Sequence, residues 1–223
     1  MKINSFKDSL FNIESANFLI GEINSIISSK NQMINIAVSG GKTPLPIFKI
    51  MCKHNINWKK INFFLVDERN VSNDSIHSNF FNIKKSFFDH IKTNYFPIYH
   101  EKLNKHKIVD NYLKIINEKV NYSNLIPQFD LIILGMGLDG HTASLFPESE
   151  ALYEKKFFCY NYVNKLSSLR YTFTYPLILN SKKNIVILKG EKKNKLIRNL
   201  NISHPIKTII DNHKNLQILC SKK

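Results

Sequence analysis

Three short motifs in this 223-residue sequence combine glycine or arginine with side chains that can bind an anion or move a proton. The motifs are Ser-Gly-Gly-Lys-Thr at residues 39–43, Asp-Glu-Arg at residues 67–69, and Gly-Met-Gly-Leu-Asp-Gly-His at residues 135–141. Each motif directly follows an apolar run that is typical of a buried strand. Because the carboxyl ends of parallel strands meet at one edge of a sheet, we expect the three motifs to lie close together.

The first motif suits a phosphate group. Ser39 and Thr43 supply hydroxyls, Gly40 and Gly41 leave the backbone N–H groups unhindered, and Pro44 is typical of the first turn of a helix, whose N-terminal end attracts anions. A turn whose glycines only relieve backbone strain is an equally compatible interpretation. The motif does not match the full P-loop pattern G-x-x-x-x-G-K-S/T, so we do not expect a nucleoside triphosphate.

The second motif contains Arg69, one of only three arginines in a sequence with 32 basic residues. A guanidinium at this edge of the sheet could clamp a phosphate or carboxylate with two parallel hydrogen bonds. The alternative is that Arg69 pairs with a surface acid. We expect Asp67 and Glu68 to orient Arg69 or to cap neighbouring backbone, and we rank both roles above direct catalysis.

The third motif ends in His141, our candidate for a general base. A lone histidine is usually a surface or core residue, but His141 follows a glycine cluster at the end of a strand, and Asp139 is close enough in sequence to fix its tautomer. An imidazole titrates near pH 6.5, which suits removal of a proton from water at neutral pH. No second histidine or cysteine stands at a ligand spacing, so the motif does not imply a metal.

Residues 135–140 also match the G-x-G-x-x-G pattern of dinucleotide-binding proteins. That pattern normally occupies the first strand-to-helix turn and is followed about 20 residues later by an acid at the end of the next strand. Here the next predicted strand ends at Asn164. A nucleophile elbow also fails, because the residues around Ser39 lack the first glycine of G-x-S-x-G. We therefore expect neither a nicotinamide cofactor nor a serine nucleophile.

Strands and helices alternate along the chain. Apolar runs predict strands at residues 34–38, 61–66, 95–98, 129–134, 157–163 and 185–188, whereas apolar residues at three- and four-residue steps predict helices at 6–27, 45–54, 79–91, 107–120 and 191–200. This order predicts one α/β domain over residues 1–223, with a Rossmann-like, mainly parallel sheet flanked by helices and a small subdomain.

Composition excludes several classes of protein. With 43% hydrophobic residues and no run of roughly 20 apolar residues, the chain is neither disordered nor membrane-spanning. The N-terminus carries acids early and does not resemble a signal peptide. Cys52, Cys159 and Cys220 have no CxxC spacing and predict reduced thiols in a cytoplasmic protein.

The net charge of +15 raises the alternative of a nucleic-acid-binding protein. The lysines are dispersed along the chain, and no nucleic-acid-binding motif is visible. The many Lys, Asn and Ile residues instead indicate a bias toward AT-rich codons. We therefore expect neither nucleic acid nor membrane as a partner.

Taken together, the motifs resemble those of the 6-phosphogluconolactonases of the pentose phosphate pathway. The resemblance rests on five segments, which are VSGGKTP at 38–44, DERNV at 67–71 with Ser78-Asn79 downstream, LGMGLDGHTASLFP at 134–147, RYT at 170–172 and GEKK at 190–193. It implies a fold like that of the sugar-phosphate isomerase and CoA-transferase group. It also implies hydrolysis of 6-phospho-D-glucono-1,5-lactone to 6-phosphogluconate without a metal or other cofactor, in a cytoplasmic protein that we expect to be a monomer, with a weak dimer left open.

The resemblance also implies roles for individual residues. His141 would activate water, while the residue 39–43 loop, Arg69, Arg170 and Lys193 would hold the phosphate and the sugar hydroxyls of a small sugar phosphate lactone. N–H groups of the residue 135–140 loop, that of Gly137 included, or the Arg170 side chain would offset charge on the tetrahedral oxyanion.

Glucosamine-6-phosphate deaminases share the Gly-x-Asp-Gly-His stretch, but they typically carry a catalytic glutamate five residues after the histidine. Phe146 stands at that position here, followed by Pro147. Because ring opening and amine transfer need a second proton carrier, the missing acid favours the lactonase.

Overall fold

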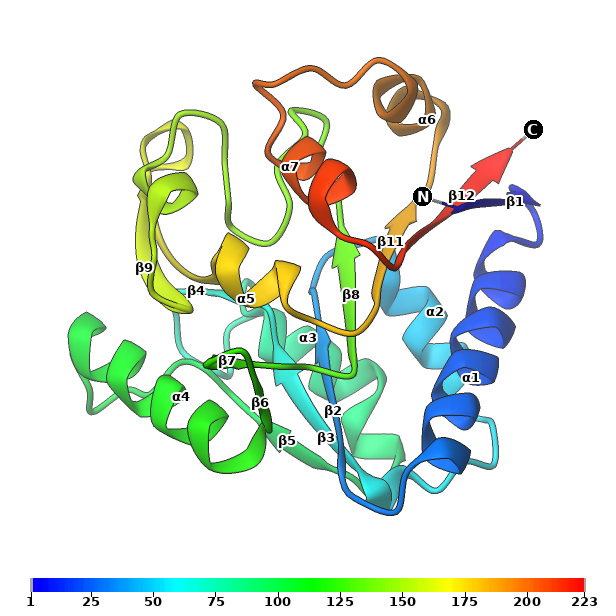
Figure 1. Cartoon of the computed structure of the whole chain (residues 1–223), viewed down its shortest axis with the longest axis horizontal. Helices are drawn as coiled ribbons and strands as arrows, with labels where there is room; N and C mark the ends of the chain where they lie inside the picture. The colour runs from blue at the N-terminus through cyan, green and yellow to red at the C-terminus, as the bar shows by residue number, and fades with distance from the viewer. Residues whose placement is uncertain (1, 223) are drawn as a thin grey trace.

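A seven-stranded sheet forms the centre of the molecule (Figure 1). The computed structural model describes residues 2–222. The strand order is β1-β12-β11-β8-β2-β3-β5, and every neighbouring pair in this sheet is parallel. The strands are β1 (Lys2–Lys7), β2 (Ile34–Val38), β3 (Ile61–Leu65), β5 (Asn94–Phe96), β8 (Leu131–Gly135), β11 (Asn184–Leu188) and β12 (Leu216–Lys222). The predicted α/β fold with a mainly parallel sheet is confirmed.

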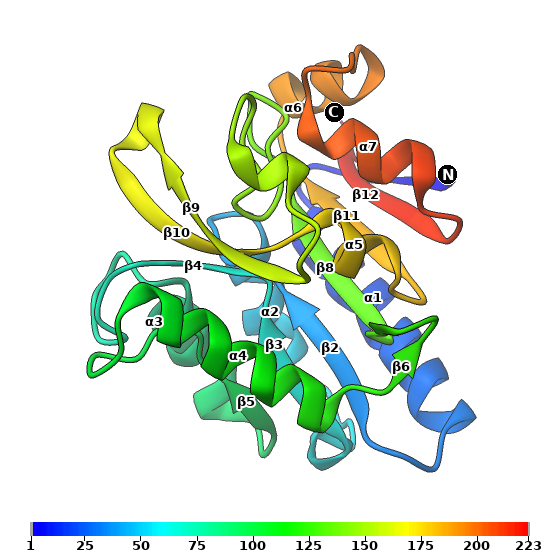
Figure 2. The ribbon, with the colours of Figure 1, turned by 60° about the vertical axis from the view of Figure 1, so that its left-hand side comes forward.

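Helices cover both faces of this sheet, as Figures 1 and 2 show. One face carries α1 (Phe11–Ser29), α2 (Pro44–Met51) and α3 (Asn79–Ser86), and the other carries α4 (Lys105–Lys119), α5 (Tyr175–Leu179) and α7 (Pro205–Asn212). Strands β2, β3 and β11 are fully buried because both faces are covered. The short α6 (Glu191–Arg198) follows β11 at the carboxyl end of the sheet.

The chain reverses its direction across the sheet between β2 and β8. From β2 it continues to β3 and β5 on one side, whereas from β8 it continues to β11 and β12 on the other. In such a sheet a crevice opens beyond the carboxyl ends of the two strands at the reversal, and ligands bind there. The glycine motifs at residues 39–43 and 135–141 directly follow β2 and β8, so the topology places both at this crevice.

A second, antiparallel sheet of β4 (Asp67–Arg69), β10 (Ser168–Phe173) and β9 (Phe158–Val163) lies beside the carboxyl end of the first (Figure 2). The chain moves from one sheet to the other directly after Leu65, whose N–H and C=O both bond to the buried Tyr112 hydroxyl, at 2.8 and 2.9 Å. Val66 then joins the two sheets, because its N–H donates to Val38 and its C=O accepts from Phe173. The pair of strands β6 (Tyr122–Ser123) and β7 (Ile126–Pro127) forms a small hairpin elsewhere.

Several predicted elements were wrong. The helix predicted from Phe6 begins at Phe11, because residues 2–7 form β1 and pair with β12 from the other end of the chain. The helix predicted over residues 79–91 ends at Ser86, and a 3-10 helix follows (Phe88–His90). The strand predicted over 157–163 is confirmed as β9 (Phe158–Val163), but it lies in the antiparallel sheet and not in the parallel one. Elements β10, β12, α5 and α7 were not predicted.

Candidate active site

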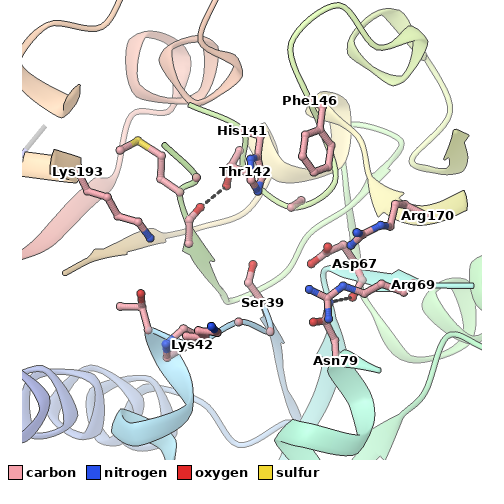
Figure 3. A pocket seen from close by; sticks show the side chains of 18 residues that line it. Ser39, Lys42, Asp67, Arg69, Asn79, His141, Thr142, Phe146, Arg170 and Lys193 are labelled. Atoms are coloured by element: carbon pink, nitrogen blue, oxygen red, sulfur yellow. Dashed lines mark hydrogen bonds between the residues drawn. The ribbon is translucent and has the colours of Figure 1, made fainter. Parts of the chain in front are cut away.

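A cavity of about 240 Å³ opens at the crevice between β2 and β8 (Figure 3). The three motifs meet there, as predicted, and they are joined by residues from β10, α3 and α6. Of the residues singled out from the sequence, those that line it are Ser39, Gly40, Gly41, Thr43, Asp67, Arg69, Gly137, His141, Arg170 and Lys193. Asp139 lies behind His141 and lines two neighbouring hollows.

In the loop after β2 the backbone lies so close to Asn79 that there is no room for a side chain at Gly40. A Cβ on Gly40 would lie 2.1 Å from Asn79 Oδ1, and Gly41 has a φ of +106°. Both glycines are therefore needed by the backbone itself, as the alternative interpretation of this motif requires. The hydroxyl of Ser39 is different, because the residue is 4% exposed and its buried Oγ has no hydrogen-bond partner. An unpaired buried hydroxyl that lines a cavity favours an incoming ligand.

The two acids of the second motif have separate structural roles. Glu68 is fully buried and accepts hydrogen bonds from the N–H groups of Arg69, Asn79 and Phe80 and from the Ser78 hydroxyl, so it caps the start of α3. Asp67 accepts a hydrogen bond of 2.8 Å from the Ser144 hydroxyl and lines the cavity. Neither acid pairs with the Arg69 guanidinium, so the backbone-capping role holds for Glu68.

Arg69 and Arg170 are register partners on β4 and β10 and line the same end of the cavity (Figure 3). Arg69 Nη1 donates to the His77 carbonyl at 2.8 Å, while its buried Nε has no partner. Burial and the charge of Arg69 lower the pKa of Arg170. Two adjacent guanidiniums with unused donors favour an anionic ligand.

Two lysines stand at the opposite end of the cavity. Figure 3 shows Lys42 and Lys193 on one side and the arginine pair on the other, with Ser39 between them. Burial lowers the pKa of Lys193, which reaches the cavity from α6. Four basic side chains and one acid, Asp67, therefore line this cavity. Such a site attracts a compact anion.

His141 is held in place by a carboxylate. Its Nδ1 lies 2.5 Å from Asp139 Oδ1, as the sequence predicted for a residue that fixes the tautomer, and the contact at Nδ1 leaves Nε2 for another partner. Burial raises the pKa of Asp139, but hydrogen bonds and charge interactions with His141 and Lys165 together lower it to about 2. Asp139 therefore remains ionised beside the imidazole at neutral pH.

The imidazole is also fixed by what touches its faces. Phe146 stacks on it with ring centroids 4.1 Å apart, and a Cβ on Gly137 would come within 2.2 Å of it. The N–H of Gly137 donates to the His141 carbonyl at 2.8 Å. This N–H is thus already used within the loop, and an oxyanion would have to be met by other donors such as Arg170.

Sequence reasoning assigned no site role to several residues that line the cavity, among them Lys42, Asn79, Thr142 and Phe146. Lys42 lies in the glycine motif at residues 39–43, and Asn79 is part of the Ser78-Asn79 pair downstream of the second motif. Their positions in these motifs could therefore have identified both residues from the sequence. In the sequence, Phe146 marks only the absence of an acid five residues after His141. Among residues 2–222 no group of three His, Cys, Asp or Glu side chains is placed to hold a metal ion, and in the same part of the chain no helix is long and apolar enough to cross a membrane.

Comparison with known proteins agrees with this geometry. The family model described as glucosamine-6-phosphate isomerases/6-phosphogluconolactonase matches residues 9–218. A 6-phosphogluconolactonase of Haemophilus influenzae is 33% identical over 184 residues, which is 78% of this chain and 76% of the relative. A 6-phosphogluconolactonase of Synechocystis is 34% identical over 169 residues, or 71% of this chain and 67% of the relative.

Solved structures show the same similarity. The crystal structure of a 6-phosphogluconolactonase from Thermotoga maritima superposes with a TM-score of 0.87 at 26% identity and covers 99% of both chains. The Trypanosoma brucei 6-phosphogluconolactonase has the same TM-score at 21% identity, over 99% of this chain and 96% of that one, and so supports the fold.

Proposed function

The chain belongs to the family of glucosamine-6-phosphate isomerases and 6-phosphogluconolactonases, and from this premise we propose that it hydrolyses 6-phospho-D-glucono-1,5-lactone to 6-phospho-D-gluconate in the oxidative pentose phosphate pathway. The observation that carries the proposal is the fixed His141–Asp139 pair at the wall of a cavity lined by four basic side chains. A base beside an anion-binding site is what hydrolysis of a phosphorylated lactone requires.

Binding begins with the phosphate. In this proposal the Gly40-Gly41 loop, the free Ser39 hydroxyl, Thr43 and Arg69 hold the phosphate. Arg170 and Lys193, which line opposite ends of the cavity, hold sugar hydroxyls in this proposal. Because the phosphate is fixed, the lactone carbonyl is held near His141 Nε2, which converts a bimolecular attack into a step within one complex.

The chemical step needs one base. His141 Nε2 removes a proton from a water molecule, and the water oxygen forms a bond to the lactone carbonyl carbon. The guanidinium of Arg170 stabilises the negative charge of the resulting tetrahedral oxyanion. When it collapses, the bond between the carbonyl carbon and the ring oxygen breaks, and the imidazolium returns its proton to that oxygen. Asp139 stabilises the imidazolium between the two proton transfers.

The family also contains isomerases that act on glucosamine 6-phosphate, and one observation argues against that activity here. Phe146, whose ring stacks on His141, stands five residues after it, at the sequence position where such enzymes typically carry a glutamate. A phenyl ring has no ionisable proton, so the site lacks a second acid or base at this point.

The cell compartment and assembly state are also proposed. Cys52, Cys159 and Cys220 are free thiols, and two of them are buried, which supports a reducing compartment such as the cytoplasm. We propose that the enzyme is a monomer, with a weak dimer as the alternative, and that neither nucleic acid nor membrane is a partner.

The decisive assay generates the lactone in solution and follows its disappearance against the spontaneous rate. The wild-type protein should accelerate hydrolysis, and His141→Asn should lose at least about 100-fold in kcat while still binding 6-phosphogluconate. Glucosamine 6-phosphate, offered in parallel, should not be converted. Wild-type hydrolysis no faster than the spontaneous rate would overturn the proposed function, and equal activity of His141→Asn would remove His141 from the role of base.

A further inference from the structure

Asp139 has a second partner besides His141. Its Oδ1 lies 2.5 Å from His141 Nδ1, whereas its Oδ2 lies 3.1 Å from the Nζ of Lys165. Lys165 stands in the 3-10 helix η4 (Asn164–Leu166), which forms the tip of the hairpin between β9 and β10. The hairpin that carries Arg170 into the cavity thus also reaches back to the residue behind the imidazole.

The two carboxylate oxygens of Asp139 contact two different groups, the imidazole of His141 and the ammonium group of Lys165. The carboxylate favours the protonated imidazole, because an adjacent negative charge stabilises imidazolium. The ammonium group of Lys165 lies on the other side of the same carboxylate and opposes that effect. A cation at this oxygen reduces the negative charge with which the carboxylate acts on the imidazole at its other oxygen.

Lys165 is unlike an ordinary surface lysine in its surroundings. Its side chain is 70% exposed, but the Asp139 side chain that it contacts is only 25% exposed. A pair with one exposed partner adds little to folding stability. The charge of Lys165 still acts through Asp139 on the protonation of His141. We therefore expect its effect on the pH profile of the reaction and not on the stability of the fold.

Other titratable groups line the cavities beside His141 or pack against its loop, and each stays unchanged in the test. From the elements around it these groups are Asp139 of its own loop, Asp67 and Arg69 of β4, Arg170 of β10, Lys42 before α2, Lys193 of α6 and His204 before α7. Lys165 differs from the other cations because it contacts the carboxylate that orients the imidazole.

We propose that Lys165 is a positioning residue that acts through Asp139 and extends the pH range of His141 as a base toward acid. This inference rests on the proposed function, since it concerns the same histidine. It predicts a change of pH dependence that a merely structural lysine would not produce.

The test compares variants of Lys165 that keep its positive charge with variants that remove it. Lys165→Met should move the acidic midpoint of the kcat/KM profile upward by about 0.3–0.6 pH unit at low salt. The shift should shrink in about 0.5 M salt, because mobile ions screen exposed charges. Lys165→Arg keeps the charge and should restore the wild-type midpoint. Lys155→Met, at an exposed lysine outside the cavity, removes the same charge elsewhere and should leave the midpoint unchanged.

A second measurement separates this inference from the proposed reaction. Proton NMR follows the titration of the His141 ring without substrate, so it reports on Lys165 even if the lactone proves not to be hydrolysed. An upward midpoint in Lys165→Met that Lys165→Arg reverses supports the inference. Equal midpoints in wild type and Lys165→Met, or a uniform loss of kcat without a shift, would overturn it. Absence of lactone hydrolysis by the wild type would instead overturn the proposed function.

Discussion

The ring of Phe146 lies almost parallel to the imidazole of His141, with an interplanar angle of 24° and centroids 4.1 Å apart. A sharp turn creates this contact, because Leu145 N–H bonds to the Thr142 carbonyl at 3.0 Å and Ala143 has a φ of +51°. Phe146 is itself 6% exposed, so its ring is fixed by packing. The imidazole therefore has a rigid apolar wall on one face and a carboxylate at its edge.

Removal of the Phe146 ring should lower kcat more than it weakens substrate binding. We predict that Phe146→Leu lowers kcat by about ten-fold with little change in KM, because a small displacement of a catalytic group is expensive while the phosphate contacts remain. Phe146→Tyr keeps an aromatic face and serves as the control. Steady-state kinetics with the lactone give both constants. A raised KM with unchanged kcat would instead place Phe146 in substrate binding.

Gly137 supports the imidazole by its lack of a side chain. A Cβ there would lie 2.2 Å from His141 Nδ1 and Cε1 and 2.8 Å from Asp139 Oδ1. Gly137→Ala should therefore displace the ring and reduce kcat by about 100-fold, with circular dichroism close to that of the wild type. The control is Gly21→Ala in α1, where a Cβ meets no atom within 4 Å. Full activity of Gly137→Ala would show that the loop adjusts without moving the base.

Arg69 should act on binding rather than on chemistry. Arg69 lines the cavity, its buried Nε has no hydrogen-bond partner, and its Nη1 is held by the His77 carbonyl. Arg69→Lys replaces a fork by a point charge, and we predict a KM about ten-fold higher with kcat largely kept. Arg198→Lys, at the end of α6 and outside the cavity, is the matched control. An unchanged KM would show that Arg69 is structural.

The sequence predicted the edge of the sheet at which the site lies because the signals for it are local. The apolar run Ile34–Val38 is followed at once by the glycine pair, and the structure gives a strand with these same bounds. A run of this kind and the turn after it need no information from elsewhere in the chain. The same holds for the loop that ends in His141.

Contacts between distant segments were not predictable in this way. Phe6 continues the apolar periodicity of α1, yet it lies in β1 because Ser221 of β12 is its partner. The register that sets Arg170 opposite Arg69 depends on a hairpin with no apolar alternation around the arginine. The contact of Lys165 with Asp139 spans 26 residues and depends on that same hairpin. Such pairings are set by tertiary packing.

A buried histidine far from the cavity should make stability depend on pH. His213 is 7% exposed, and its Nε2 donates to the Ser181 carbonyl at 2.9 Å. Its Nδ1 accepts the N–H of Asn215 at 3.2 Å, so the folded protein holds the neutral ring. Burial lowers the pKa of His213 in the folded state, whereas the unfolded chain binds the proton near pH 6.5.

The sign follows from these two states. Above about pH 6.5 neither state protonates this ring, and its contribution to the free energy of unfolding is constant. Below that pH the unfolded chain gains a proton that the folded ring resists, so stability falls toward the folded pKa, by at most about 1.4 kcal/mol per pH unit for one proton. Urea unfolding at pH 7.5 and pH 5.5 should therefore show a larger loss for the wild type than for His213→Asn, which does not titrate. The comparison is made between slopes, because His213→Asn also removes hydrogen bonds at every pH and the other histidines contribute equally to both proteins. Parallel losses in the two proteins would show that His213 is not the group responsible.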